Sequence, residues 1–144
     1  MENDIYILLE KFNKDDVNLF RSNYLKNFSS LKDYFEYPSW YEDGSEPEFA
    51  TENIDEMIDF MMKGNKGYFR FYFDSPTSPS QKEIYMGMIF FNEDDTLVLG
   101  VKIHSSSNEY YMAKLSKDFN SNLIMICEED TPPSTKKEFM EILG

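Results

Sequence analysis

The sequence holds few of the side chains that carry enzyme chemistry. His104 is the only histidine and Cys127 the only cysteine among 144 residues. A zinc site built from His and Cys needs several such ligands, and a Ser-His-Asp or Cys-His catalytic site would have to use His104. There is no G-x-S-x-G nucleophile elbow and no glycine-rich phosphate loop. We therefore expect a protein that is not an enzyme, with no catalytic residue, metal ion or cofactor; a carboxylate-based hydrolase stays open because acidic residues are abundant.

The histidine and the cysteine each have an ordinary structural explanation. His104 ends a predicted strand, which favours a partly exposed structural histidine over a general base. Cys127 lies in an apolar run beside acidic residues, which should raise the pKa of its thiol and leave it unreactive. A single cysteine excludes an internal disulfide framework and is typical of a reducing compartment. Because the first residues are acidic where a secretory signal is basic, we expect a cytoplasmic protein.

The negative charge is concentrated in one part of the chain. The protein carries 27 acidic and 14 basic residues, for a formal net charge of -13. Residues 33–62 contain ten acids and no Lys or Arg, whereas the other 114 residues hold 17 acids and 14 basic residues. This charge disfavours direct binding to nucleic acid or to an anionic membrane. No apolar run approaches the roughly 20 residues that span a bilayer.

The acidic segment is also rich in aromatic residues, and this combination predicts a binding surface for a basic protein. Rings anchor a protein interface, and carboxylates steer a cationic partner toward it. Trp40, the only tryptophan, and Tyr41 are the predicted anchors. The predicted partner-binding acids are Glu42, Asp43, Glu46, Glu48, Asp55 and Asp59. The alternative is that the acids serve solubility alone and that the aromatic side chains tuck beneath the loop.

Four helices can be located by their caps and their apolar spacing. In each case a polar capping residue is followed by an acid in the first turn and then by apolar residues at helical spacing. The predicted caps are Asn13, Asn53, Ser106 and Thr135. The first of these helices is expected to bury a stripe that runs from Val17 to Leu31.

The remaining apolar segments predict strands. Residues 68–73 place three phenylalanines on one face. Residues 84–91 and 96–104 flank a short polar loop and should form a hairpin. Residues 123–127 are wholly apolar, which predicts a position inside the sheet, and residues 5–12 fit either a strand or the start of a helix. These elements predict an α+β fold: a mostly antiparallel sheet with helices packed against it.

The hairpin loop also predicts a pairing register. If Phe91 faces Thr96, then Gly87 faces Gly100, and the two missing side chains leave a shallow gap on the sheet. In the structural interpretation, a helix or a large aromatic ring of the protein itself fills this gap. A ligand or a partner side chain would fill it in the functional one.

This organisation resembles that of the small acidic immunity proteins of bacterial toxin–immunity systems. The resemblance lies in one acidic α+β domain over residues 1–144, the missing catalytic set, the strand pair MGMIFFNEDDTLVLGV and a late helix-strand-helix ending. It implies a cytoplasmic protein that binds a cognate toxin and blocks its active site. A nuclease toxin would fit the carboxylates, because a site that holds phosphates is electropositive. The alternatives are a nucleic-acid-mimicking inhibitor, a regulatory adaptor, or a small ligand-binding or enzymatic domain that uses the Gly87/Gly100 gap.

Overall fold

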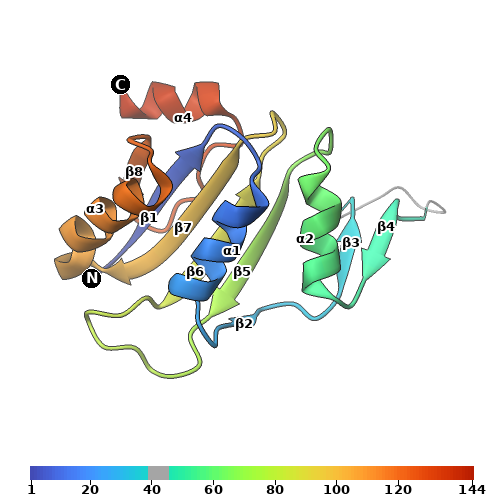
Figure 1. The fold of residues 1–144 in the computed structure, drawn as a ribbon. Helices are drawn as coiled ribbons and strands as arrows, with labels where there is room; N and C mark the ends of the chain where they lie inside the picture. Colours follow the sequence, from blue (N-terminus) through green and yellow to red (C-terminus); the bar gives the residue numbers. More distant parts are fainter. Residues whose placement is uncertain (39–45) are drawn as a thin grey trace.

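A computed structural model of the protein describes residues 1–38 and 46–144. As predicted, the fold belongs to the α+β class, with a large antiparallel sheet and helices packed against it (Figure 1). The described elements, in chain order, are β1 (Glu2–Leu9), α1 (Lys14–Asn23), β2 (Ser29–Ser30), β3 (Phe35–Tyr37), β4 (Phe49–Thr51), α2 (Ile54–Met62), β5 (Phe69–Asp74), β6 (Met86–Phe91), β7 (Leu97–His104), the short 3-10 helix η1 (Ser105–Ser107), α3 (Asn108–Phe119), β8 (Ile124–Cys127) and α4 (Lys136–Leu143).

The large sheet has the strand order β2-β5-β6-β7-β1-β8, and every neighbouring pair is antiparallel. β1 lies inside the sheet between β7 and β8, although it is the first element of the chain. Its residues from Asn3 to Leu9 are all buried. The apolar run that fitted either a strand or a helix is therefore a strand covered on both faces.

Three helices cover one face of the sheet, which we call the first face. Side chains of α1, α2 and α3 pack there against the odd-numbered residues of β5, β6 and β7. The caps of the first two helices are as predicted: Asn13 accepts hydrogen bonds from Asp15 N and Asp16 N, and Asn53 accepts from the first turn of α2. These oxygens satisfy backbone N–H groups that have no partner within the helix.

The helix α1 ends earlier than the predicted apolar stripe. It stops at Asn23, and Asn27 then takes a left-handed conformation with a φ of 66°. Beyond this turn, Leu31 N donates to Tyr72 O, so the chain runs beside β5. Leu31 is consequently 51% exposed, and only the first part of the stripe packs as a helix face.

The opposite face of the sheet, the second face, is covered differently. Among the described helices, α4 alone contributes to its apolar cluster, through the fully buried Phe139. The sheet side chains in this cluster are Tyr6, Leu8, Met88, Phe90, Val98 and Met125. Thr135 caps α4 as predicted, because its hydroxyl accepts from Glu138 N.

The β6–β7 hairpin pairs one residue away from the predicted register. Phe91 pairs with Leu97 rather than with Thr96. The turn explains the shift, because Asn92 N donates to Thr96 O and these two residues close the loop. Asp95 completes the turn with a left-handed φ of 62°. The predicted register was wrong because it counted loop residues and could not include this turn conformation.

The predicted gap between the two glycines is consequently wrong as well. A shift of one residue places Gly87 and Gly100 on opposite faces of the sheet. The protein itself occupies both spaces: a Cβ at Gly87 would lie 2.6 Å from Leu25 Cδ1, and a Cβ at Gly100 would lie 2.7 Å from Tyr6 Cε1. The two glycines therefore share no gap. A ring fills the space at Gly100, as the structural interpretation expected, whereas Leu25 from the turn after α1 fills the space at Gly87.

Two further predictions about the C-terminal half need correction. β8 was predicted to lie inside the sheet, but it is an edge strand that pairs with β1 alone. The interior position beside it belongs to β1, which lies between β7 and β8. Ser106 does not cap α3; η1 comes first, and the His104 side chain accepts a hydrogen bond from Ser106 N. α3 nevertheless buries one apolar face, with Tyr111, Leu115 and Phe119. No helix within the described residues has the length and apolar character needed to cross a membrane.

Candidate functional site

The described part of the acidic segment forms a distinct lobe beside β5. β3 and β4 pair as a small separate sheet, and α2 packs next to them (Figure 1). We call residues 33–38 and 46–62, which contain these three elements, the acidic lobe. It carries no Lys or Arg, and its acids are Asp33, Glu36, Glu46, Glu48, Glu52, Asp55, Glu56 and Asp59. Glu36 is half-buried and the other seven are exposed, so the lobe presents most of its charge to solvent.

Aromatic packing holds the lobe together. The Phe49 ring stacks on the Phe60 ring at a centroid distance of 4.5 Å, and the Tyr37 ring lies 5.5 Å from Phe60. Phe35 is 4% exposed and reaches the Phe71 ring of β5 at 5.6 Å. Phe35 is therefore part of the core, and Tyr37 and Phe49 are half-buried side chains that pack against it. The alternative that aromatic side chains tuck inward is confirmed for Phe35 and holds in part for Tyr37 and Phe49.

Hydrogen bonds at the N-terminus of α2 cap this helix and involve one of its acids. Thr51 Oγ1 donates to Glu56 Oε2 and accepts from Asn53 N. Glu56 thus completes the cap through Thr51 instead of bonding directly to the backbone of Asn53, as the usual capping box would have it. The acids of this first turn lie at the positive end of the helix dipole, which stabilises them as carboxylates.

Two of the predicted partner-binding acids already form ion pairs within the protein. Asp55 pairs with Arg21 and Asp59 pairs with Lys14, so both connect α2 to α1. The carboxylate side chains remain 68% and 61% exposed. Exposed ion pairs of this kind contribute from zero to about 1 kcal/mol to stability. A cation of the partner could therefore replace Arg21 or Lys14 at little cost.

The remaining predicted residues divide into two groups. Glu46 and Glu48 are exposed on the lobe, and Glu48 forms an ion pair with Lys66 at 3.3 Å. The predictions for Trp40, Tyr41, Glu42 and Asp43 lie outside the described residues. Five lobe acids form no ion pair with a described cation: Asp33, Glu36, Glu46, Glu52 and Glu56.

The residues considered for catalysis have structural partners. His104 Nδ1 lies 2.8 Å from Ser106 Oγ, at the start of η1. Burial raises the pKa of the Cys127 thiol, as expected for an unreactive cysteine. Within residues 1–38 and 46–144, no group of three or more His, Cys, Asp and Glu side chains is placed to hold a metal ion.

One polar cluster on the second face gave no signal in the sequence. Asp4 is 3% exposed, and its carboxylate lies 3.0 Å from Lys102 Nζ on the neighbouring strand. Tyr6 O–H donates to Asp130 O at 2.7 Å, and burial raises the pKa of this phenol far above its usual value. The cluster joins residues 102 and 130 to β1. These residues are far apart in the sequence and come together only in the folded sheet. The cluster fixes the loop that leads from β8 to α4.

Comparisons with known proteins assign no family. No family model matches the chain, and no curated protein matches it. A similar solved structure is a chain from the complex of the toxic C-terminal tip of CdiA from Pseudomonas aeruginosa with an immune protein. The identity is 13% and the TM-score 0.48, with 90% of this chain and 88% of that chain covered. A likeness of this size establishes neither a shared fold nor a shared partner.

Proposed function

We propose that this protein is a non-enzymatic binding protein, an immunity protein that neutralises a basic toxin domain by covering its active site or the surface beside it. The observation that carries the proposal is the acidic lobe, with eight carboxylates, no Lys or Arg and aromatic rings packed inside it. The proposal rests on this charge layout and not on the structural likeness reported above.

The lobe has the physical properties that such binding needs. Its exposed carboxylates create a negative field that attracts a cationic surface from a distance and speeds association. Its aromatic rings pack the described part of the small sheet against α2, and a surface that is already packed loses less freedom when a partner binds. A toxin that acts on nucleic acid fits best, because a site that holds phosphates is itself positively charged.

Within the lobe, the acids without an internal ion pair are the strongest candidates for contact. Glu46, Glu52 and Glu56 are exposed and can receive cations without first losing a bond to a described Lys or Arg. Asp55 and Asp59 must exchange Arg21 and Lys14 for the partner's cations. We expect the first group to contribute more to the association rate.

Co-expression with a toxin domain tests the proposal. The toxin domain to use is the C-terminal part of a large protein encoded beside this gene, identified first from the gene neighbourhood, and growth of the host reports neutralisation. We expect the wild-type protein to restore growth and to bind the purified toxin domain. A variant with Glu46, Glu48, Glu52 and Glu56 changed to Gln should associate about tenfold more slowly at low salt, with a weaker dependence on salt.

The matched control carries the same change of charge elsewhere. Glu93, Glu109, Glu128 and Glu141 are exposed outside the lobe, and changing all four to Gln removes the same number of charges. This control should associate at nearly the wild-type rate. If both quadruple variants slow association equally, net charge and not the lobe governs binding, and if neither does, the acids serve solubility alone.

The predicted anchor is tested separately from the charges. Trp40→Ala should raise the dissociation rate and weaken binding by about 2 kcal/mol or more, because a central aromatic anchor carries that much of an interface. Its association rate should change little. Surface plasmon resonance measures both rates, and a wild-type dissociation rate for Trp40→Ala would remove this residue from the interface.

A further inference from the structure

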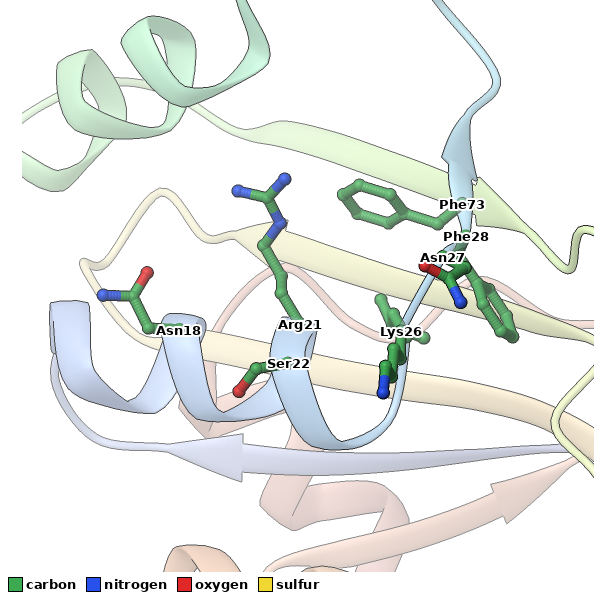
Figure 2. A pocket seen from close by; sticks show the side chains of 8 residues that line it. Asn18, Arg21, Ser22, Lys26, Asn27, Phe28 and Phe73 are labelled. Carbon is green, nitrogen blue, oxygen red and sulfur yellow. The ribbon is translucent and has the colours of Figure 1, made fainter.

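A hollow beside the acidic lobe has the opposite chemical character. It lies between α1 and the edge of the sheet formed by β2 and β5, and Figure 2 shows its side chains. We call it the α1 groove. Its volume is about 660 Å³. This value falls in the range of about 300–1,000 Å³ that is typical of sites for small molecules.

The lining of the α1 groove contains no carboxylate. Its polar side chains are two cations, Arg21 and Lys26, together with two asparagines and a serine, all of which can donate hydrogen bonds. The absence of acids is notable in a protein with 27 acidic residues. Three other hollows among the described residues each include at least one acid: Glu83 in one, Glu10 and Asp16 in another, Glu2 and Asp74 in the third.

Several donors of the groove are unused within the protein. Asn18, Lys26 and Asn27 form no side-chain hydrogen bond or ion pair with another described residue. Arg21 Nη1 donates a hydrogen bond to Asp55, and the guanidinium carbon of Arg21 lies 5.7 Å from the centre of the Phe73 ring. Its other N–H groups stay available, because a guanidinium has five donors.

The lining of the groove also has an apolar part. Leu25 and Phe73 are 5% and 3% exposed, and Phe28 packs beside them as a half-buried side chain. Leu25 is held in place because its methyl groups fill the space above Gly87. The groove thus combines a fixed apolar part with a set of free donors.

We propose that the α1 groove binds a small organic anion, in which a phosphate or carboxylate group is attached to an apolar ring-sized body. Lys26 and the free N–H groups of Arg21 receive the anionic group, because charged donors form the strongest hydrogen bonds to oxyanions. The half-buried Phe28 contacts the apolar body, together with the small exposed parts of Leu25 and Phe73. This site lies outside the acidic lobe, although Arg21 connects the two through its ion pair with Asp55.

A titration of the full chain followed by NMR tests the proposal with four probes. Phenyl phosphate and phenylacetate combine a ring with an anion, inorganic phosphate lacks the ring, and benzyl alcohol lacks the charge. We expect the two ring-bearing anions to bind more tightly than either control probe, with shifts centred on residues 18–28 and 73. Their relative affinities identify the preferred anionic group. Equal binding of benzyl alcohol or of inorganic phosphate would overturn the proposal.

A matched pair of variants locates the site. Lys26 is exposed and forms no hydrogen bond or ion pair with another described residue, so Lys26→Gln should fold normally. It should weaken phenyl phosphate binding about tenfold, the value of one hydrogen bond to a charged group. Lys137→Gln, on the exposed side of α4, removes the same charge far from the groove and should leave the affinity unchanged. An equal loss in both variants would show that the anion senses only overall charge, and no loss in either would show that Lys26 does not bind it; each result would refute the site.

Discussion

The two faces of the large sheet are covered in different ways. The first face is buried by α1, α2 and α3, whose aromatic and aliphatic side chains form one continuous cluster with the sheet. The second face relies on α4, which has a single buried side chain, Phe139. On α4, Met140, Ile142 and Leu143 remain 42–63% exposed.

This difference indicates where the stability of the protein is concentrated. A helix that docks through several side chains opens only when the cluster itself is disrupted, whereas a helix that docks through one ring can open locally. Polar contacts assist α4: Lys136 N donates to Asp94, and Lys136 Nζ pairs with Glu10. We therefore expect the first face to set global stability and the second face to be the first to open.

The largest effect is expected from removing one ring on each face. Phe20 and Phe139 are both fully buried, and Phe20 also contacts the rings of Tyr24 and Phe119. Phe20→Ala should lower the free energy of unfolding by about 3–5 kcal/mol, because the cavity cannot collapse in a core shared by three helices. Phe139→Ala should cost less in global stability, since α4 can leave while the rest of the sheet persists.

Urea unfolding and amide hydrogen exchange distinguish these two outcomes. In Phe139→Ala we expect fast exchange confined to α4 and the loop before it, with the first-face strands still protected. In Phe20→Ala we expect protection to fall throughout the sheet. If both variants lose protection in the same residues, the two faces unfold as one unit and the comparison fails.

A smaller loss is expected from adding a side chain at either glycine. Gly87→Val would meet Leu25 on the first face, and Gly100→Val would meet the Tyr6 ring on the second. Overpacking of this kind costs about 1–3 kcal/mol. Gly87→Val should be partly rescued by Leu25→Ala, because the shorter side chain vacates the space. Thermal melts of the single and double variants measure the coupling, and the absence of rescue would mean that backbone strain causes the loss.

The smallest effect is expected at the turn that holds the start of α4. Asp94 accepts hydrogen bonds from Lys136 N at 2.8 Å and from Thr96 N at 3.2 Å. Partial burial opposes the charge on this carboxyl, but the hydrogen bonds from Thr96 and Lys136 outweigh burial and lower its pKa. Asp94→Asn should cost about 1 kcal/mol at neutral pH, the usual net value of one hydrogen bond.

The lowered pKa also predicts a dependence on pH. The stabilisation by the Asp94 carboxylate is fully present above the unfolded pKa, near 4, and is lost as the pH falls through the lower folded value. The difference in melting temperature between wild type and Asp94→Asn should therefore shrink from pH 7 to pH 3. Glu93→Gln, a neighbouring change at an exposed acid, is the control and should show little difference at either pH. A constant difference across this range would contradict the assignment.

Much of the candidate site could be predicted from the sequence, because its charge is a property of composition. The run of acids without Lys or Arg in residues 33–62 identified the lobe directly, and capping signals located α2. Its internal ion pairs could not be predicted, since Arg21 and Lys14 belong to a different helix. The α1 groove was missed for the same reason: Phe73 joins Arg21 and Lys26 only when β5 lies beside α1.

The sequence by itself determined the features that depend on near neighbours. Caps at Asn13, Asn53 and Thr135, the alternation of β5 and the acidic segment all follow from residues a few positions apart. Only the tertiary structure decided the hairpin register, the opposite faces of the two glycines, the interior position of β1 and the edge position of β8. These features depend on a turn conformation and on contacts between distant segments. Such contacts are selected by the burial of the whole sheet, and a local pattern does not contain them.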